Sequence, residues 1–266
     1  VNTNDINCDG TMTISGDGVL NAENRSTDSM ARSLGGSIIL NGGTVNATGT
    51  VKTNSLEIHN DGVLNANASA TSYDGAAVNV GGSITVDGNG SLNAVGCAIE
   101  NQDIMNTAIL LNGNQDSKIS VTGNGSITVP DSNGARYGIC YDVDRRRINA
   151  EISGKVTAYG TMCGISGINL IMSGTGSVYA TGDTLGIDNT DTAIDENEFV
   201  IKGSTEYKAS ESTVTSEVTL YGVYYKIDGE YAKTVVIKPD TSPRIILGNQ
   251  IGIFKTEEYK IIEDID

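Results

Sequence analysis

The sequence has no tryptophan, two phenylalanines, three prolines and one histidine among its 266 residues. A globular core of ordinary composition uses more large aromatic side chains than this. The apolar residues are instead small or β-branched and occur in short runs, which favours narrow layers of strands. The 33 glycines are typical of a turn-rich β fold or of a disordered chain. The hydrophobic content of 38% favours the folded alternative.

Charge and hydropathy exclude several kinds of partner. The 33 acidic residues outnumber the 17 basic ones, the net charge is −16, and no basic block occurs. We therefore expect no nucleic-acid partner. No apolar run approaches the roughly 20 residues that span a bilayer, so we expect no membrane insertion. The chain begins at Val1 rather than Met, and we expect it to be a piece of a longer protein.

The cysteines lack the CxxC spacing that is typical of metal sites. The four are Cys8, Cys97, Cys140 and Cys163. Three of them lie in small apolar stretches, "GCAI", "GICY" and "MCGI". This context favours buried free thiols, and a disulfide is the alternative interpretation.

One short unit recurs along the chain, as in "LEIHNDGVLNA" at 56–66 and "ITVDGNGSLNA" at 84–94. Apolar and polar residues alternate on both sides of a glycine-centred corner, which predicts two short strands with one buried face. Eight copies follow one another at intervals of 18 to 35 residues. A third apolar segment lies between copies, for example "CAIEN" at 97–101 and "YGICY" at 137–141. Three strands per repeat predict the coil of a parallel β-helix.

Stacked coils would bury equivalent side chains as interior rows, about 4.8 Å apart. One predicted row consists of Leu20, Leu64, Leu92, Ile127 and Val178. A narrower one consists of Ala22, Ala47, Ala66, Ala94, Ala158 and Ala180. A sandwich of antiparallel hairpins, with "GDG" and "GNG" as its turns, is the competing architecture. Hairpins do not account for the third apolar segment between the units.

The units "NGGTVNATG" and "GNGSLNAVG" resemble those of glycine-rich parallel β-helix proteins of the bacterial cell surface. These include adhesins and a carbohydrate-binding β-helix family of the pectate-lyase-like superfamily. The resemblance covers about residues 10–209. We therefore expect an all-β protein, a single-stranded, right-handed parallel β-helix of about seven coils over residues 1–209. The resemblance implies an extracellular location on the bacterial surface, and we expect a monomer.

Residues 210–266 differ in character, because the glycine units stop and apolar and polar residues alternate around "IDGE". Asp228-Gly229 predicts a hairpin turn. The last coil of a β-helix has an exposed strand edge with unpaired backbone N–H and C=O groups, and an antiparallel element can cover it. We expect residues 210–266 to form a C-terminal antiparallel β cap or a small β unit.

Catalytic signatures are sparse. The resemblance implies that a pectin-cleaving hydrolase would carry paired Asp, "GHG" and "RIK" near "NTD", but only "NTD" occurs, at 189–191. It also implies that a lyase would combine calcium-binding acids with a basic residue, and "DVDRRR" at 142–147 is the one dense mixture of charges. Asp142 and Asp144 are therefore candidate Ca²⁺ ligands, with an exposed loop as the alternative. We assign no catalytic residue.

Position 10 of the unit is polar and outward, between two inward apolar residues. It is occupied by Asn21, Asn46, Asn65 and Asn93, and then by Thr128, Thr157 and Tyr179. Such a row can bind an extended polysaccharide, or its side chains can hydrogen-bond one another along the stack. Tyr159 and Tyr179 are candidate platforms for sugar rings. A corner row of Asp17, Asp61, Asn89 and Asn124 consists of turn formers, and weak Ca²⁺ binding is its alternative role.

From these patterns we expect a non-catalytic extracellular surface protein, adhesin-like or glycan-binding. Its partner would be a polysaccharide or a glycan of a host or cell surface. The first alternative is a polysaccharide lyase or hydrolase with a site around residues 137–147. The second is a passive structural spacer. We expect no cofactor, with Ca²⁺ as the one candidate.

Overall fold

The computed structural model describes ten stretches of the chain up to residue 188 and six short strands beyond it. The stretches are 2–3, 10–23, 36–68, 76–98, 106–114, 116–132, 134–141, 148–172, 177–182 and 185–188. The short strands are 199–201, 206–208, 225–227, 230–232, 235–237 and 244–246. Every secondary-structure element of these residues is a β-strand. The alternation read from the sequence is present in them, since Leu56 and Ile58 are fully buried while Glu57 and His59 between and beside them are partly exposed.

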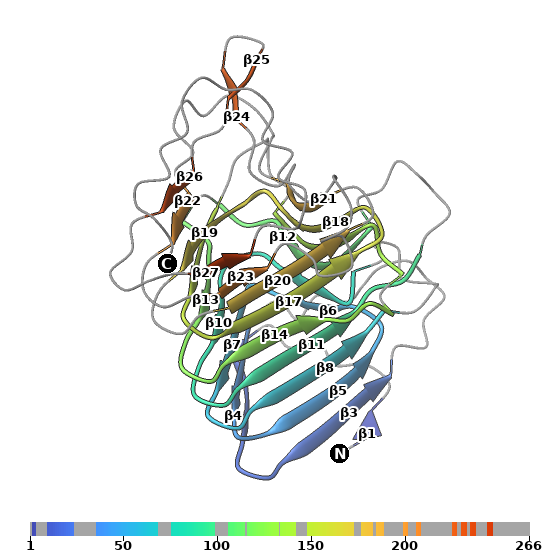
Figure 1. The fold of residues 1–266 in the computed structure, drawn as a ribbon. Coiled ribbons are helices and arrows are strands. Elements are labelled where there is room, and N and C mark those ends of the chain that lie inside the picture. Colours follow the sequence, from blue (N-terminus) through green and yellow to red (C-terminus); the bar gives the residue numbers. More distant parts are fainter. Residues whose placement is uncertain are drawn as a thin grey trace.

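The strands form three large sheets, which Figure 1 shows from the side of the largest. The ten-stranded sheet has the order β1 (Asn2–Thr3), β3 (Val19–Glu23), β5 (Thr44–Thr48), β8 (Val63–Asn67), β11 (Ser91–Val95), β14 (Ser126–Val129), β17 (Lys155–Gly160), β20 (Ser177–Gly182), β23 (Glu206–Lys208) and β27 (Arg244–Ile246). The nine-stranded sheet has the order β2 (Met12–Ser15), β4 (Ser37–Asn41), β7 (Ser55–His59), β10 (Ile84–Val86), β13 (Lys118–Val121), β16 (Ile148–Ile152), β19 (Ile168–Met172), β22 (Phe199–Ile201) and β26 (Val235–Ile237). The six-stranded sheet has the order β6 (Val51–Thr53), β9 (Val78–Val80), β12 (Thr107–Leu111), β15 (Tyr137–Tyr141), β18 (Cys163–Ser166) and β21 (Leu185–Asp188).

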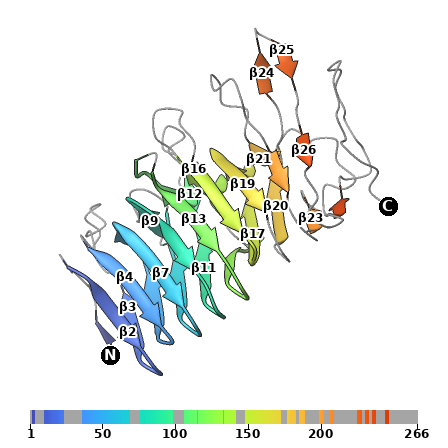
Figure 2. The same cartoon turned by 90° about the vertical axis from the view of Figure 1, so that its left-hand side faces the viewer.

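Each sheet takes one strand from each successive turn of the chain, and the strands in it are parallel, as β7 with β10 and β8 with β11. Six coils therefore contribute a strand to all three sheets, and the two larger sheets continue beyond them at both ends. Figure 2 shows the coils from the side as successive layers. The chain is a parallel β-helix, as the repeat predicted. The parallel pairing contradicts the competing sandwich of antiparallel hairpins.

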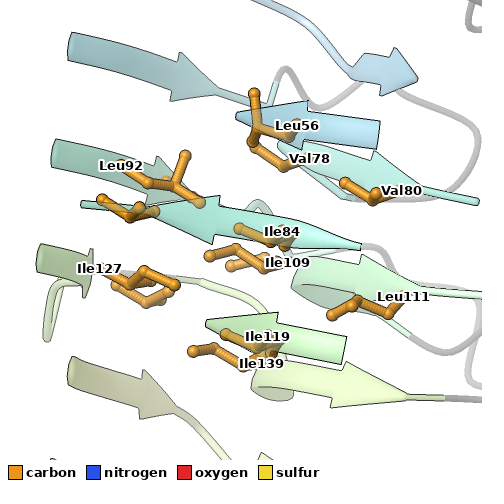
Figure 3. Packing of buried hydrophobic residues seen from close by; sticks show 14 of the residues in the cluster. Leu56, Val78, Val80, Ile84, Leu92, Ile109, Leu111, Ile119, Ile127 and Ile139 are labelled. Atoms are coloured by element: carbon orange, nitrogen blue, oxygen red, sulfur yellow. The ribbon is translucent and has the colours of Figure 1, made fainter. Parts of the chain in front are cut away.

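The interior rows are those that the unit alignment predicted. Leu64 pairs with Leu92, and Leu92 pairs with Ile127, and all three are fully buried. The row also contains Val45 and Val156, which belong to shortened copies of the unit. In Figure 3, Leu92 and Ile127 meet residues of the other two sheets, such as Ile84 and Ile109, in one apolar interior. Burying each such side chain contributes about 1.5–3 kcal/mol.

The corners need glycine for two different reasons. Gly88 and Gly123, at the first corner position, have φ of 62° and 64°. Residues that carry a Cβ adopt such backbone angles only at an energetic cost. Asn60 occupies the same position with φ of 57°. Gly125 has no such φ, but a Cβ there would lie 2.6 Å from the carbonyl oxygen of Val86 in the preceding coil. Close stacking of backbones therefore excludes a side chain at this third corner position.

One predicted third strand was wrong. The segment "CAIEN" at 97–101 does not supply it; the third strand of that coil is β12, Thr107–Leu111. The chain carries an insertion between β11 and β12, and the apolar residues just after β11 drew the prediction to the wrong place.

Thr107 at the start of β12 is fully buried, and its hydroxyl makes no hydrogen bond.

Three cysteines are free thiols, as predicted. Cys140 and Cys163 are fully buried, whereas Cys97 is only partly buried. Burial raises the pKa of the Cys97 thiol, and a hydrogen bond with its own backbone offsets part of this effect. Cys8 lies outside the described residues.

Strands beyond residue 210 are of two kinds. β24 (Tyr225–Ile227) pairs antiparallel with β25 (Glu230–Ala232), in agreement with a hairpin at Asp228-Gly229, which itself lies outside the described residues. β26 and β27 instead pair in parallel with β22 and β23, and so continue the two larger sheets. The division of the chain at residues 209 and 210 stays a prediction.

Candidate functional site

The outer face of the ten-stranded sheet carries a row of hydrogen-bonded amides, which we call the asparagine ladder: Asn21, Asn46, Asn65 and Asn93. Register places these residues side by side on β3, β5, β8 and β11. Each Nδ2 donates to the Oδ1 of the preceding coil, at 2.8 Å from Asn46 to Asn21, 2.8 Å from Asn65 to Asn46, and 2.9 Å from Asn93 to Asn65. The sequence predicted the row, and the structure adds that its members bind one another.

The ladder uses only part of the hydrogen-bonding capacity of its amides. An asparagine side chain has two N–H donors and two lone pairs on its oxygen. In Asn65, one N–H is bonded to Asn46 and one lone pair accepts from Asn93. Asn65 is half-buried, so its remaining donor and acceptor lie at the surface of the sheet. The ladder therefore fixes the orientation of its amides and still leaves polar groups for a ligand.

The same row continues toward the C-terminal coils with other polar side chains. Thr128 pairs with Asn93, Thr157 pairs with Thr128, and Tyr179 pairs with Thr157. Tyr159 lies two residues beyond Thr157 on β17 and is therefore a diagonal neighbour of Tyr179 on β20. Both tyrosines are half-buried and belong to the outward phase of their strands. The structure thus brings together on one face all six residues predicted for binding.

The corner row also forms hydrogen bonds between coils. Nδ2 of Asn89 donates to Oδ1 of Asp61, and Nδ2 of Asn124 donates to Oδ1 of Asn89, each at 2.9 Å. Asn60 donates in the same way to Asn41 at the neighbouring corner position. One oxygen of Asp61 thus faces an amide donor.

Within the described part of the chain, no group of three or more His, Cys, Asp or Glu side chains is placed to hold a metal ion. The candidate calcium ligands Asp142 and Asp144 lie outside the described residues, as does the tripeptide "NTD" at 189–191. Calcium binding by Asp142 and Asp144 stays a prediction.

A cluster on the nine-stranded sheet was missed by the sequence analysis. The imidazole of His59 lies between two carboxylates: Nδ1 is 2.9 Å from Oδ2 of Asp87, and Nε2 is 3.2 Å from Oε2 of Glu57. Partial burial lowers the pKa of His59, but the hydrogen bonds to Asp87 and Glu57 outweigh it and raise the pKa above the ordinary 6.5. The signal was present, because His59 and Asp87 both occupy position 4 of their units, which aligned coils bring together.

The fold and these rows define the class of molecule: a parallel β-helix whose surface is organised as ladders of polar side chains joining successive coils. Comparison with protein-family models, with curated proteins and with solved structures finds no match for the chain. A search of the described residues for a helix of the length and apolarity of a membrane span finds none.

Proposed function

We propose that the chain is a non-catalytic binding module that holds an extended glycan on the outer face of the ten-stranded sheet. The observation that carries the proposal is the asparagine ladder, with one oriented amide in each of four successive coils. Its amides repeat at the spacing of parallel strands, about 4.8 Å. A polysaccharide presents hydroxyl groups just as regularly, so one chain can contact several coils at once.

Repetition is what makes such a surface effective. A single hydrogen bond exchanged with water contributes only about 0.5–1.5 kcal/mol. Several contacts along one polymer add up, because each bound sugar raises the effective concentration of the next. Tyr159 and Tyr179 stand at the C-terminal end of the row, where their rings can cover the apolar face of a sugar.

The proposal includes an adhesin-like role outside the cell, on a bacterial surface. Its support is the likeness of the glycine-centred units to those of bacterial surface β-helices, together with the acidic, polar exterior of the coils. The expected partner is a polysaccharide or a glycan of a host or cell surface.

A passive structural spacer is the second candidate function, and a specific observation favours it. The ladder amides bond one another at 2.8–2.9 Å, so the row has a role in joining coils whether or not a ligand exists. A spacer would need the ladder only for stability. Polysaccharide cleavage, in contrast, has no supporting geometry among the described residues.

Retention on insoluble polysaccharides distinguishes these functions. We expect the protein to be retained by at least one glycan of a panel, and the double variant Tyr159→Ala, Tyr179→Ala to lose this retention. Tyr137→Ala is the matched control, since Tyr137 is a half-buried tyrosine on β15 of the six-stranded sheet. Retention by the double variant equal to that of the control would exclude the two tyrosines from the binding surface. No retention of the unsubstituted protein on any glycan would favour the spacer.

A further inference from the structure

The Glu57–His59–Asp87 cluster joins two successive coils. Glu57 and His59 belong to β7, and Asp87 follows β10, which pairs in parallel with β7. Both ring nitrogens face a carboxylate oxygen, at 2.9 Å and 3.2 Å. An ionised carboxylate can only accept hydrogen bonds, and neutral histidine has a single N–H. Both contacts can therefore be hydrogen bonds only when the imidazole is doubly protonated.

We infer that Glu57, His59 and Asp87 form a pH-sensitive clasp between these two coils, which holds both contacts when His59 is charged and is weakened when it loses its proton. After the loss, the ring keeps one N–H, so one carboxylate still accepts a hydrogen bond, while the other faces a lone pair and its contact becomes repulsive. The contact to Asp87 is the one that joins the coils. The inference rests on geometry alone and does not depend on the proposed glycan binding.

The groups around His59 favour its charged form. On the side of β4, its register partner is Asn41, which does not titrate. On the side of β10, the outward residue beside Glu57 is Thr85, and the acidic groups of this corner are Asp87 and Asp61. The closest basic side chain described on this sheet, Lys118, approaches Glu151 on β16 at 3.9 Å. The described surroundings of the imidazole are therefore acidic or neutral.

The direction of the pH effect follows from the pKa of His59. Burial lowers this pKa, but the hydrogen bonds to Asp87 and Glu57 raise it above 6.5 on balance. A histidine whose pKa is raised by folding stabilises the folded state fully below 6.5, and loses that contribution as the pH rises through the higher folded value. The clasp therefore weakens toward alkaline pH.

Nuclear magnetic resonance of the imidazole tests the inference directly, because His59 is the single histidine of the chain. We expect the titration midpoint to lie above 6.5, so that at pH 6.5 more than half of the rings carry a proton on both nitrogens. Asp87→Asn and Glu57→Gln should each move the midpoint to lower pH. Glu151→Gln, which removes a carboxylate of the same face away from the cluster, should leave it unchanged. A midpoint at or below 6.5, or one that Asp87→Asn does not move, would overturn the clasp.

The coupling to stability needs a second measurement, the urea midpoint of unfolding between about pH 6 and 9. We expect the midpoint to fall with rising pH, and His59→Gln to flatten this dependence. Asn89→Ala is the matched control: it removes a bond between the same two coils, to Asp61, and one from Asn124 of the next coil, without removing a titratable group. It should lower the midpoint equally across this range. Parallel profiles for His59→Gln and the unsubstituted protein would contradict the inference.

Discussion

Substitution of Asn65 by alanine measures how much the asparagine ladder contributes to stability. Asn65 donates one side-chain hydrogen bond to Asn46 and accepts one from Asn93, so Asn65→Ala removes two. Each bond contributes about 0.5–1.5 kcal/mol net, and water can replace the lost partners because the row is half-exposed. We therefore expect the free energy of unfolding to fall by about 1–2 kcal/mol.

Two further variants calibrate this value. Asn93→Ala removes only the bond to Asn65 and should cost about half as much. Asn67→Ala is the matched control, because Asn67 is an exposed asparagine on the same strand, β8, and should change stability by less than about 0.5 kcal/mol.

Urea unfolding followed by far-ultraviolet circular dichroism suits the measurement, since the chain has no tryptophan for fluorescence. Equal stabilities of Asn65→Ala and Asn67→Ala would refute the reasoning. The amides would then contribute nothing to joining the coils, and their regular placement would need another explanation, of which ligand binding is the first.

Three other changes test separate features. Gly125→Ala should destabilise the protein by about 1–3 kcal/mol, because its Cβ would lie 2.6 Å from the carbonyl oxygen of Val86; an unchanged urea midpoint would contradict the close stacking of the corners. Thr107→Val should raise stability by about 1 kcal/mol, since it removes a buried hydroxyl without a partner, and a loss of stability would show that the hydroxyl is bonded after all. Cys97 should be alkylated more slowly at neutral pH than a cysteine peptide, because burial raises its pKa, with the rate rising as the solution becomes alkaline; equal rates at neutral pH would contradict this environment.

The fold was predictable because two independent periods agree in this sequence. Alternation within each unit separates inward from outward residues, and the recurrence of the unit decides which residues of different coils meet. Leu64 and Leu92 are 28 positions apart in the chain, yet aligning their units suffices to pair them. The same alignment placed the asparagines in one row. What it could not decide is whether the amides bond one another, because this depends on side-chain rotamers.

Two of the three failures come from places where the spacing of the repeat changes. β12 was misplaced because an insertion separates it from β11, and the unit pattern says nothing about insertion length. Val45 and Val156 were left out of the interior row because their units have shortened corners. The His59 cluster was missed for a different reason: position 4 was treated strand by strand, although the contact to Asp87 arises only between coils.

Among the described strands, those of each coil pair with strands of the coil before it and of the coil after it. A force applied to the two ends of such a stack passes through every interface between coils in series. The weakest interface therefore sets the mechanical strength of the whole molecule, however well the others are packed. In a protein that tethers one surface to another, the hydrogen-bonded amides at the corners and on the flat face would resist separation of the coils. They would distribute the applied force over two places across the width of each coil.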